Sequence, residues 1–116
     1  MSILIVTCLF PDEAQAFAAA EAAVEAGLAA CCQVGAPVRS VYRWQGKLER
    51  AEEVPLICKT TEAAWPRLEA LLKKRHPYET PEIIAVPVTH GLPAYLAWIG
   101  ENTVSADEAA DRNKAD

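Results

Sequence analysis

Two prolines placed four residues apart constrain the fold of this chain more than any other feature. Pro77 and Pro81 lie within residues 75–84, between a segment with helical periodicity and an apolar run. Each proline fixes its own φ angle and moves the preceding residue out of the helical region. His76 is therefore predicted to end a helix, in a rigid loop that holds imidazole, phenol and carboxylate groups. The residues alone leave equally open that Pro77 only stops the helix and that Tyr78 packs over its end.

Length and composition indicate one globular domain. The 116 residues suffice for a two-layer core but not for two domains. The apolar share of 52% is typical of a folded chain, and no apolar run approaches the roughly 20 residues of a membrane-spanning helix. The apolar start, residues 2–10, has no basic leader and ends at Pro11, so we expect no signal peptide. We therefore expect no membrane partner.

The net charge and the cysteines limit which partners the protein binds and in which compartment it lies. A net charge of −5 argues against a nucleic-acid partner. The four cysteines include no Cys-x-x-Cys pair and form no small disulfide framework. They are typical of reduced, buried thiols, and we predict a cytoplasmic protein.

The first third of the chain is predicted to form a strand and a helix. The β-branched run at residues 3–8 favours a strand buried on both faces. A helix should begin around Pro11-Asp12-Glu13 and end at Gly27 in a left-handed cap. Its apolar stripe is predicted to consist of Phe17, Ala20, Val24 and Leu28.

The middle of the chain is predicted to form a hairpin. Residues 30–44 read as extended with a break at 35–37, and Gln45-Gly46 is typical of a tight turn. The return strand, residues 47–58, is polar at first and apolar later, so the hairpin should project its polar half beyond the core.

A second helix and a last strand should follow. Thr60-Thr61 is predicted to start the helix, although Pro66 requires either a later start or a kink. Its apolar stripe would be Trp65, Leu68, Leu71 and Leu72. Residues 83–88 read as a strand, in which Pro87 indicates a sheet edge or a bulge. A short helix after Pro93 would complete a single domain of residues 1–100, and the polar residues 101–116 are predicted to form a flexible tail.

This order of elements predicts an α+β fold. The succession β-α-β-β-α-β is the split-βαβ, ferredoxin-like arrangement, with helices on one face of an antiparallel sheet and here a short C-terminal helix added. The first and last strands are apolar on both faces, so something must cover the far face of the sheet. We therefore predict self-association, with sheets packed against each other at the centre of an oligomer.

One group of side chains is predicted to meet at one end of the sheet. We expect the two outer strands to run antiparallel to the two central ones, which would bring Cys8, Cys31, Lys59 and the loop of His76 together. A thiolate and an imidazole suit copper or zinc, although two ligands do not complete a tetrahedral site. The alternative is that Cys8 is a small buried hydrophobe and His76 a helix-end cation.

The carboxylates and aromatic side chains near this loop leave further alternatives open. Lys59 beside Glu79 or Glu82 is either an ordinary ion pair or a charge that selects an anionic ligand. Trp44 and Tyr42 are interpreted as interface or core aromatics rather than as stacking platforms.

Catalytic signatures are missing from the sequence. It has no serine nucleophile matched to a histidine, no glycine-rich phosphate loop and no zinc-binding HExxH helix. A Cys8–His76 nucleophile pair would lack a third orienting group. We therefore predict a protein that is not an enzyme and has no organic cofactor.

Several segments, in the same order along the chain, resemble the signature segments of the CutA divalent-cation tolerance proteins. They are Leu28-Ala29-Ala30-Cys31, Ser40-Val41-Tyr42-Arg43-Trp44-Gln45-Gly46-Lys47, Lys59-Thr60-Thr61, His76-Pro77-Tyr78-Glu79-Thr80-Pro81-Glu82-Ile83-Ile84 and Tyr95-Leu96-Ala97-Trp98. The resemblance implies a ferredoxin-like fold, a tight homotrimer similar to the PII signalling proteins, a cytoplasmic location in bacteria and a role in tolerance to copper and other divalent ions.

The resemblance also implies a metal site. In bacterial members a copper site is attributed to a cysteine at the end of the first strand and to two consecutive histidines before the Pro-Tyr loop. Here Cys8 takes the cysteine position and His76 the second histidine position, whereas Arg75 replaces the first histidine. Because arginine stays protonated and cannot ligate, this mode of binding Cu(II) is weakened here.

Three functions remain in competition. The first is a non-enzymatic homotrimer for metal tolerance that binds Cu(II) or another divalent ion weakly through Cys8 and His76. The second is a PII-like sensor or scaffold, in which clefts between subunits around Lys59, Tyr78 and Glu82 hold a small anion or a protein partner. The third is a stable trimer whose motif residues serve assembly alone.

Overall fold

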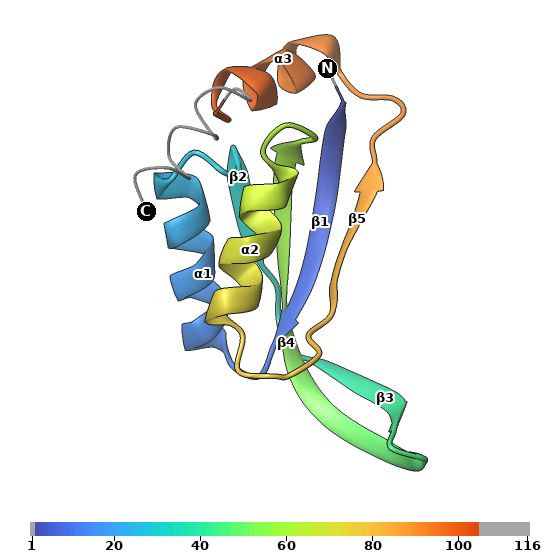
Figure 1. The fold of residues 1–116 in the computed structure, drawn as a ribbon. Helices are drawn as coiled ribbons and strands as arrows, with labels where there is room; N and C mark the ends of the chain where they lie inside the picture. The colour runs from blue at the N-terminus through green and yellow to red at the C-terminus, as the bar shows by residue number, and fades with distance from the viewer. Residues whose placement is uncertain (1, 105–116) are drawn as a thin grey trace.

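A five-stranded antiparallel sheet and three helices make up the part of the chain that the computed structural model describes, residues 2–104 (Figure 1). The strands are β1 (Ile3–Phe10), β2 (Cys31–Val34), β3 (Val38–Trp44), β4 (Lys47–Thr61) and β5 (Ile83–Pro87). The helices are α1 (Glu13–Glu25), α2 (Trp65–Arg75) and α3 (Pro93–Glu101). Helices α1 and α2 lie across the same face of the sheet, which confirms the predicted α+β layering. Helix α3 lies at the end of the sheet where β1 begins.

The order of the strands corrects one prediction. The sheet runs β2-β4-β1-β5, every neighbouring pair is antiparallel, and β3 pairs only with the first half of β4. Directions therefore alternate across the sheet, so the two central strands β1 and β4 are antiparallel to each other rather than aligned as predicted. Lys59 lies opposite Ile5, three residues before Cys8 on β1, which separates the two by about 10 Å along the strands.

Helix α1 packs on the sheet through alanines. The side chain of Asp12 caps it by accepting a hydrogen bond from the Gln15 amide at 2.9 Å. Gly27 ends it with φ 73°, confirming the predicted left-handed cap. The predicted stripe is wrong in part, because Phe17 and Val24 are nearly half exposed. The buried positions of the helix are Ala16, Ala19, Ala20 and Ala23. Small side chains let the helix lie close to the sheet, which leaves the bulky ones at its flanks.

Helix α2 begins later than predicted. Thr60 and Thr61 belong to β4, where they pair with β1, and the Thr60 hydroxyl donates to the carbonyl of Leu28 at 2.6 Å. The prediction that Thr60-Thr61 starts the helix is therefore wrong, and the later start is confirmed, with Pro66 in the first turn. Leu68 and Leu72 are fully buried. His76 is the C-cap with ψ 133°, as predicted.

The end of the described chain packs onto the same body. Strand β5 pairs only with β1, so Pro87 does lie at a sheet edge. After α3, Thr103 and Val104 are buried, and the Val104 amide donates to the carbonyl of Gly27 at 2.8 Å. Ordered packing thus continues past residue 100, and residues 105–116 of the predicted tail lie outside the described residues. Among residues 2–104, no helix has the length and apolar character needed to cross a membrane.

The face of the sheet opposite α1 and α2 carries apolar side chains. In antiparallel pairs, directly opposed residues share a face, so Ile5 and Val86 lie side by side, as do Thr7 and Ile84. Ile84 and Val86 are each more than half exposed. This surface, which we call the open face, includes Ile5, Thr7, Leu9, Pro55, Ile57, Ile84 and Val86.

Candidate functional site

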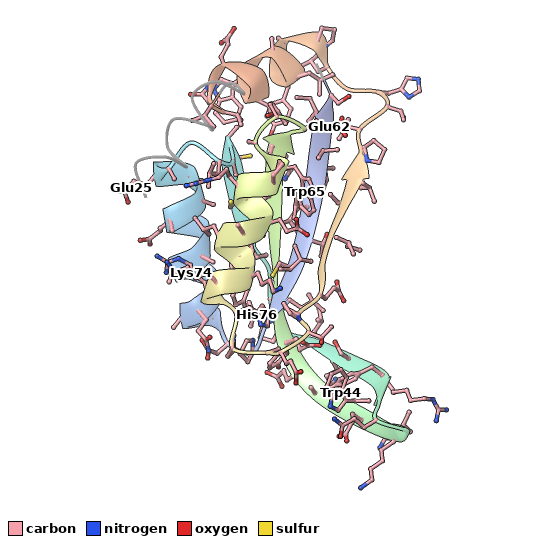
Figure 2. All side chains as sticks on the ribbon, viewed as in Figure 1. Glu25, Trp44, Glu62, Trp65, Lys74 and His76 are labelled. Carbon is pink, nitrogen blue, oxygen red and sulfur yellow. The ribbon has the colours of Figure 1, made fainter. Side chains whose placement is uncertain are left out.

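His76 lies where α2 ends beside the last residues of β1 (Figure 2). Its ring stacks on Phe10 with centroids 4.6 Å apart and is largely buried. Its Nε2 lies 2.5 Å from the carbonyl oxygen of Leu9, and the Tyr78 amide lies 3.2 Å from Nδ1. Because a carbonyl only accepts and an amide only donates, Nε2 carries the proton and Nδ1 accepts. Both nitrogens are occupied, which leaves no lone pair for a metal ion in this conformation.

Cys8 is also not available to bind a metal ion in this conformation. Its side chain is fully buried in the core between β4 and β5. Burial, with a smaller contribution from the charge of Glu82, raises the pKa of the Cys8 thiol to about 12. Since the thiolate is the form that binds metals, Cys8 at neutral pH behaves as a small apolar side chain.

The residues of a single subunit therefore do not form a prepared metal site. Within residues 2–104, no cluster of three or more histidine, cysteine, aspartate or glutamate side chains is placed to hold a metal ion. Cys8, His76 and Glu82 do belong to the same end of the sheet, as predicted. Ligation by Cys8 and His76 stays a prediction.

Cys31 and Lys59 lie toward the other end of the sheet, near α3. They are paired in register, the Cys31 sulfur lies 3.4 Å from the Tyr95 hydroxyl, and the Lys59 ammonium donates to the side chain of Gln33. The predicted convergence of these two residues with His76 is therefore wrong. It followed from aligning the central strands, whereas the end of β4 actually lies beside the start of β1.

A cavity beside His76 brings together other predicted residues. It has a volume of about 360 Å³ and lies between the β3–β4 hairpin and the loop before β5. We call it the carboxylate–aromatic pocket, and its lining residues are Tyr42, Trp44, Glu53, Tyr78, Glu79, Thr80 and Glu82. Of these, Trp44, Tyr78, Glu79 and Glu82 were cleft candidates from the sequence.

Sequence reasoning missed Glu53 and Thr80. Glu53 pairs with Val38 of β3, so it shares a face of the hairpin with Tyr42 and Trp44. The register of the hairpin, counted back from the Gln45-Gly46 turn, would have revealed this.

The pocket is negatively charged. Its lining holds three glutamates and no lysine, arginine or histidine. Burial raises the pKa of the Tyr78 phenol, and the charge of Glu53 raises it further. The field in the pocket therefore favours a cation and opposes the anionic ligand considered from the sequence.

Known proteins resemble this chain over most of its length. Residues 4–102 match the family model described as CutA1 divalent ion tolerance protein. A divalent-cation tolerance protein CutA of Thermus thermophilus is 42% identical over 99 residues, which are 85% of this chain and 96% of that protein. The CutA of Escherichia coli K12 / DH10B is 44% identical over 96 residues, 83% of this chain and 86% of that protein.

Solved structures agree with the sequence comparisons. The divalent cation tolerance protein (Cut A1) from Thermus thermophilus superposes with a TM-score of 0.86 at 41% identity, covering 88% of this chain and 99% of that chain. A CutA from Archaeoglobus fulgidus, described as a periplasmic divalent cation tolerance protein, superposes with a TM-score of 0.83 at 33% identity, covering 86% of this chain and 97% of that one.

Proposed function

The chain belongs to the CutA1 divalent ion tolerance family, and we propose that it acts in divalent-cation tolerance as a homotrimer that catalyses no reaction. The observation that carries the proposal is the open face. Helices α1 and α2 cover one side of the sheet, while Ile84 and Val86 on the other side are more than half exposed. A contiguous apolar surface of this kind is uncommon on monomers, and a second copy of the sheet would cover it.

The hairpin adds to the surface that needs a partner. Val41 and Leu48 are each about 60% exposed, and Tyr42 and Trp44 are about 40% exposed. Val41 and Leu48 lie on one face of the hairpin and Tyr42 and Trp44 on the other, so one subunit exposes apolar side chains both on the hairpin and on the open face. Three copies around one axis, similar to the PII signalling proteins, would bury both.

Divalent-ion binding at Cys8 and His76 would be weak in this chain. To bind Cu(II) or another divalent ion there, the protein must break the hydrogen bond at one nitrogen of the His76 ring and deprotonate a thiol with a pKa of about 12. Arg75 cannot supply the missing ligand. We propose that such binding is of low affinity and strengthens with rising pH, because the Cys8 thiol must lose its proton before it can bind a metal ion.

A calorimetric titration tests this ligand assignment. Cu(II) is titrated into the wild type, into the Cys8→Ser/His76→Ala double variant, and into His90→Ala, whose histidine is exposed and serves as the matched control. We expect a smaller heat of Cu(II) binding in the double variant than in wild type, and an unchanged heat in His90→Ala. Equal heats in wild type and double variant would end the assignment to Cys8 and His76.

The assembly is tested separately by equilibrium sedimentation. We expect a mass three times that of the 12.6 kDa chain. A folded single chain at every concentration tested would overturn the trimer.

A PII-like sensor or scaffold is the second candidate function, and the carboxylate–aromatic pocket supports the form of it that holds a protein partner rather than a small anion. A cavity of about 360 Å³ is within the usual range for a small-molecule site. A cytoplasmic location also stays part of the proposal, on the strength of the reduced thiols Cys8, Cys31, Cys32 and Cys58.

A further inference from the structure

We propose that Cys32 and Cys58 form a peroxide-sensitive thiol pair, in which hydrogen peroxide oxidises Cys32 and Cys58 then closes an intramolecular disulfide with it. Both cysteines belong to one subunit and lie on the sheet face that α1 and α2 cover, opposite the open face. The proposal goes beyond divalent-cation tolerance and depends neither on a metal at Cys8 and His76 nor on the trimer.

The two sulfur atoms are already in contact. Cys32 on β2 lies directly opposite Cys58 on β4, and their Sγ atoms are 3.3 Å apart. Farther along the same pairing, the Gly35 amide donates to the carbonyl of Pro55 at 2.9 Å. Hydrogen-bonded and non-hydrogen-bonded pairs alternate in an antiparallel ladder, so Cys32 and Cys58 form a non-hydrogen-bonded pair, whose Cα atoms are typically about 4.5 Å apart. Because disulfides span Cα separations of about 4.4–6.8 Å, closing this one needs little backbone movement.

The other two cysteines are not placed to bridge Cys58. Successive side chains of a strand point to opposite faces, so Cys31 faces away from Cys58, and its sulfur lies 3.4 Å from the Tyr95 hydroxyl. Cys8 lies opposite Leu56, two positions along β4 from Cys58. Such diagonal neighbours have Cα atoms about 7–8 Å apart, which exceeds the usual span of a disulfide. Cys32 is therefore the cysteine that the fold pairs with Cys58.

Cys32 is the more reactive thiol of the pair. A hydrogen bond from Cys58 lowers the pKa of Cys32, although partial burial opposes this shift, and the charge of Lys59 adds a smaller lowering. The same hydrogen bond, together with complete burial, raises the pKa of Cys58, so Cys58 keeps its proton. Because the thiolate is the form that attacks a peroxide, Cys32 is oxidised first and Cys58 reacts second.

A groove between α1 and β2 gives a small oxidant access to Cys32. It has a volume of about 540 Å³, and Phe17, Val24 and Cys32 are part of its lining. Among the described residues, that lining includes none from the hairpin or the open face, so the surfaces assigned to trimer contacts lie elsewhere. Glu21 and Glu25 also line the groove, and their charges disfavour an anionic oxidant. Hydrogen peroxide is small and neutral, which suits this entrance.

The oxidation proceeds in two steps. The Cys32 thiolate attacks one oxygen of hydrogen peroxide, the O–O bond breaks, and the leaving hydroxide takes up the proton that Cys32 released, which gives water and a sulfenic acid on Cys32. The Cys58 sulfur then attacks the Cys32 sulfur, the S–O bond breaks, and the hydroxide leaves with the Cys58 proton as a second water. Overall, two thiols are oxidised to one disulfide and one hydrogen peroxide is reduced to two waters.

Counting thiols after peroxide treatment tests the pair. The reduced full-length protein is treated, with a metal chelator present, with an amount of hydrogen peroxide that fully oxidises free cysteine, and is then alkylated in denaturant and weighed by mass spectrometry. We expect two of the four cysteines to escape alkylation, a peptide map that joins Cys32 to Cys58, and recovery of all four thiols with dithiothreitol. Four alkylated cysteines, a bridge between chains, or a bridge that includes Cys8 or Cys31 would overturn the proposal.

Matched variants assign the order of the two steps. Cys32→Ala should slow the peroxide-dependent loss of thiols at least about tenfold, because it removes the attacking thiolate. Cys31→Ala removes the neighbouring thiol on the opposite face of β2, and we expect less than about twofold change. Cys58→Ala should stop the reaction at the sulfenic acid of Cys32, which dimedone traps as a stable adduct. Equal rates in Cys32→Ala and Cys31→Ala would refute the assignment, and should Cys58→Ala fail to fold, the peptide map of the wild type decides.

Discussion

The helix-covered body and the projecting hairpin are built around one strand and differ in how their side chains are covered. Residues 54–61 of β4 lie in the sheet under α1 and α2, where Val54, Leu56 and Cys58 are buried. The first half of the same strand continues beyond the body and pairs only with β3 (Figure 1). There Val41, Trp44 and Leu48 are exposed. Figure 2 shows Trp44 on this hairpin, away from the helical layer.

The difference shows which part of the fold the chain completes by itself. In the body, apolar residues of strands and helices cover each other. In the hairpin there is no second layer, so Val41, Leu48 and Trp44 each stay at least about 40% exposed within one subunit. Coverage by another copy, as in the proposed trimer, would account for their apolar character.

The largest expected effect comes from making the same leucine-to-alanine change in each of the two regions. Leu68→Ala removes a fully buried side chain of α2 and should lower the free energy of unfolding by about 2–5 kcal/mol. Leu48→Ala makes the same change on the exposed hairpin and should cost less than about 0.5 kcal/mol. Urea unfolding at low protein concentration measures both. Similar losses at the two sites would abolish the distinction between body and hairpin.

A smaller effect is expected on assembly. Trp44→Ala should raise the dissociation constant of the oligomer by about 30-fold or more, corresponding to at least about 2 kcal/mol for an interface tryptophan. Trp98→Ala, on α3, removes a tryptophan of similar exposure and is the matched control. Sedimentation over a dilution series measures the two constants. If Trp44→Ala dissociates no more readily than wild type, the hairpin is not an assembly surface.

The smallest effect concerns the covered thiol and appears only in alkali. The pKa of Cys8 is raised from 9.0 to about 12 by burial, so the unfolded chain loses this proton first as pH rises. Stability contributed by the thiol is therefore complete below pH 9 and declines between pH 9 and 12, by about 1.4 kcal/mol at pH 10. Unfolding at pH 8 and pH 10 should show a smaller decline in Cys8→Ala than in wild type or Cys31→Ala. Parallel declines in all three proteins would contradict the assignment.

Much of the fold could be predicted because its turns and helix ends depend on a few residues that are neighbours in the sequence. The Gln45-Gly46 turn, the Gly27 cap and the helix end at His76 each depend on residues whose backbone preferences are narrow. The errors concern choices that depend on neighbours. Thr60 and Thr61 suit both a helix start and a strand, and pairing with β1 decides for the strand.

The candidate site was predicted less well for the same reason. The loop from His76 to Glu82 could be located from its prolines, but the strands opposite it could not be located without their directions. The direction of β4 relative to β1 places Lys59 and Cys31 at the far end of the sheet and Glu53 beside Tyr78. The incorrect direction of β4 relative to β1 was therefore enough to include Lys59 and Cys31 in the predicted site and to leave Glu53 out of it.

The fifteen-residue length of β4 also bears on the order in which the chain folds. Its pairing with β3 joins residues close in sequence, with Trp44 opposite Lys47, whereas its pairing with β1 joins Phe10 to Val54 and Ile3 to Thr61. A β-hairpin forms in about 1–10 microseconds, whereas the entropy lost in closing a loop grows with the length of the loop. We therefore expect the hairpin to form early and β1 to pair with β4 late. The rate of this late pairing determines how long the aggregation-prone edge of β4 remains unpaired in a newly made chain.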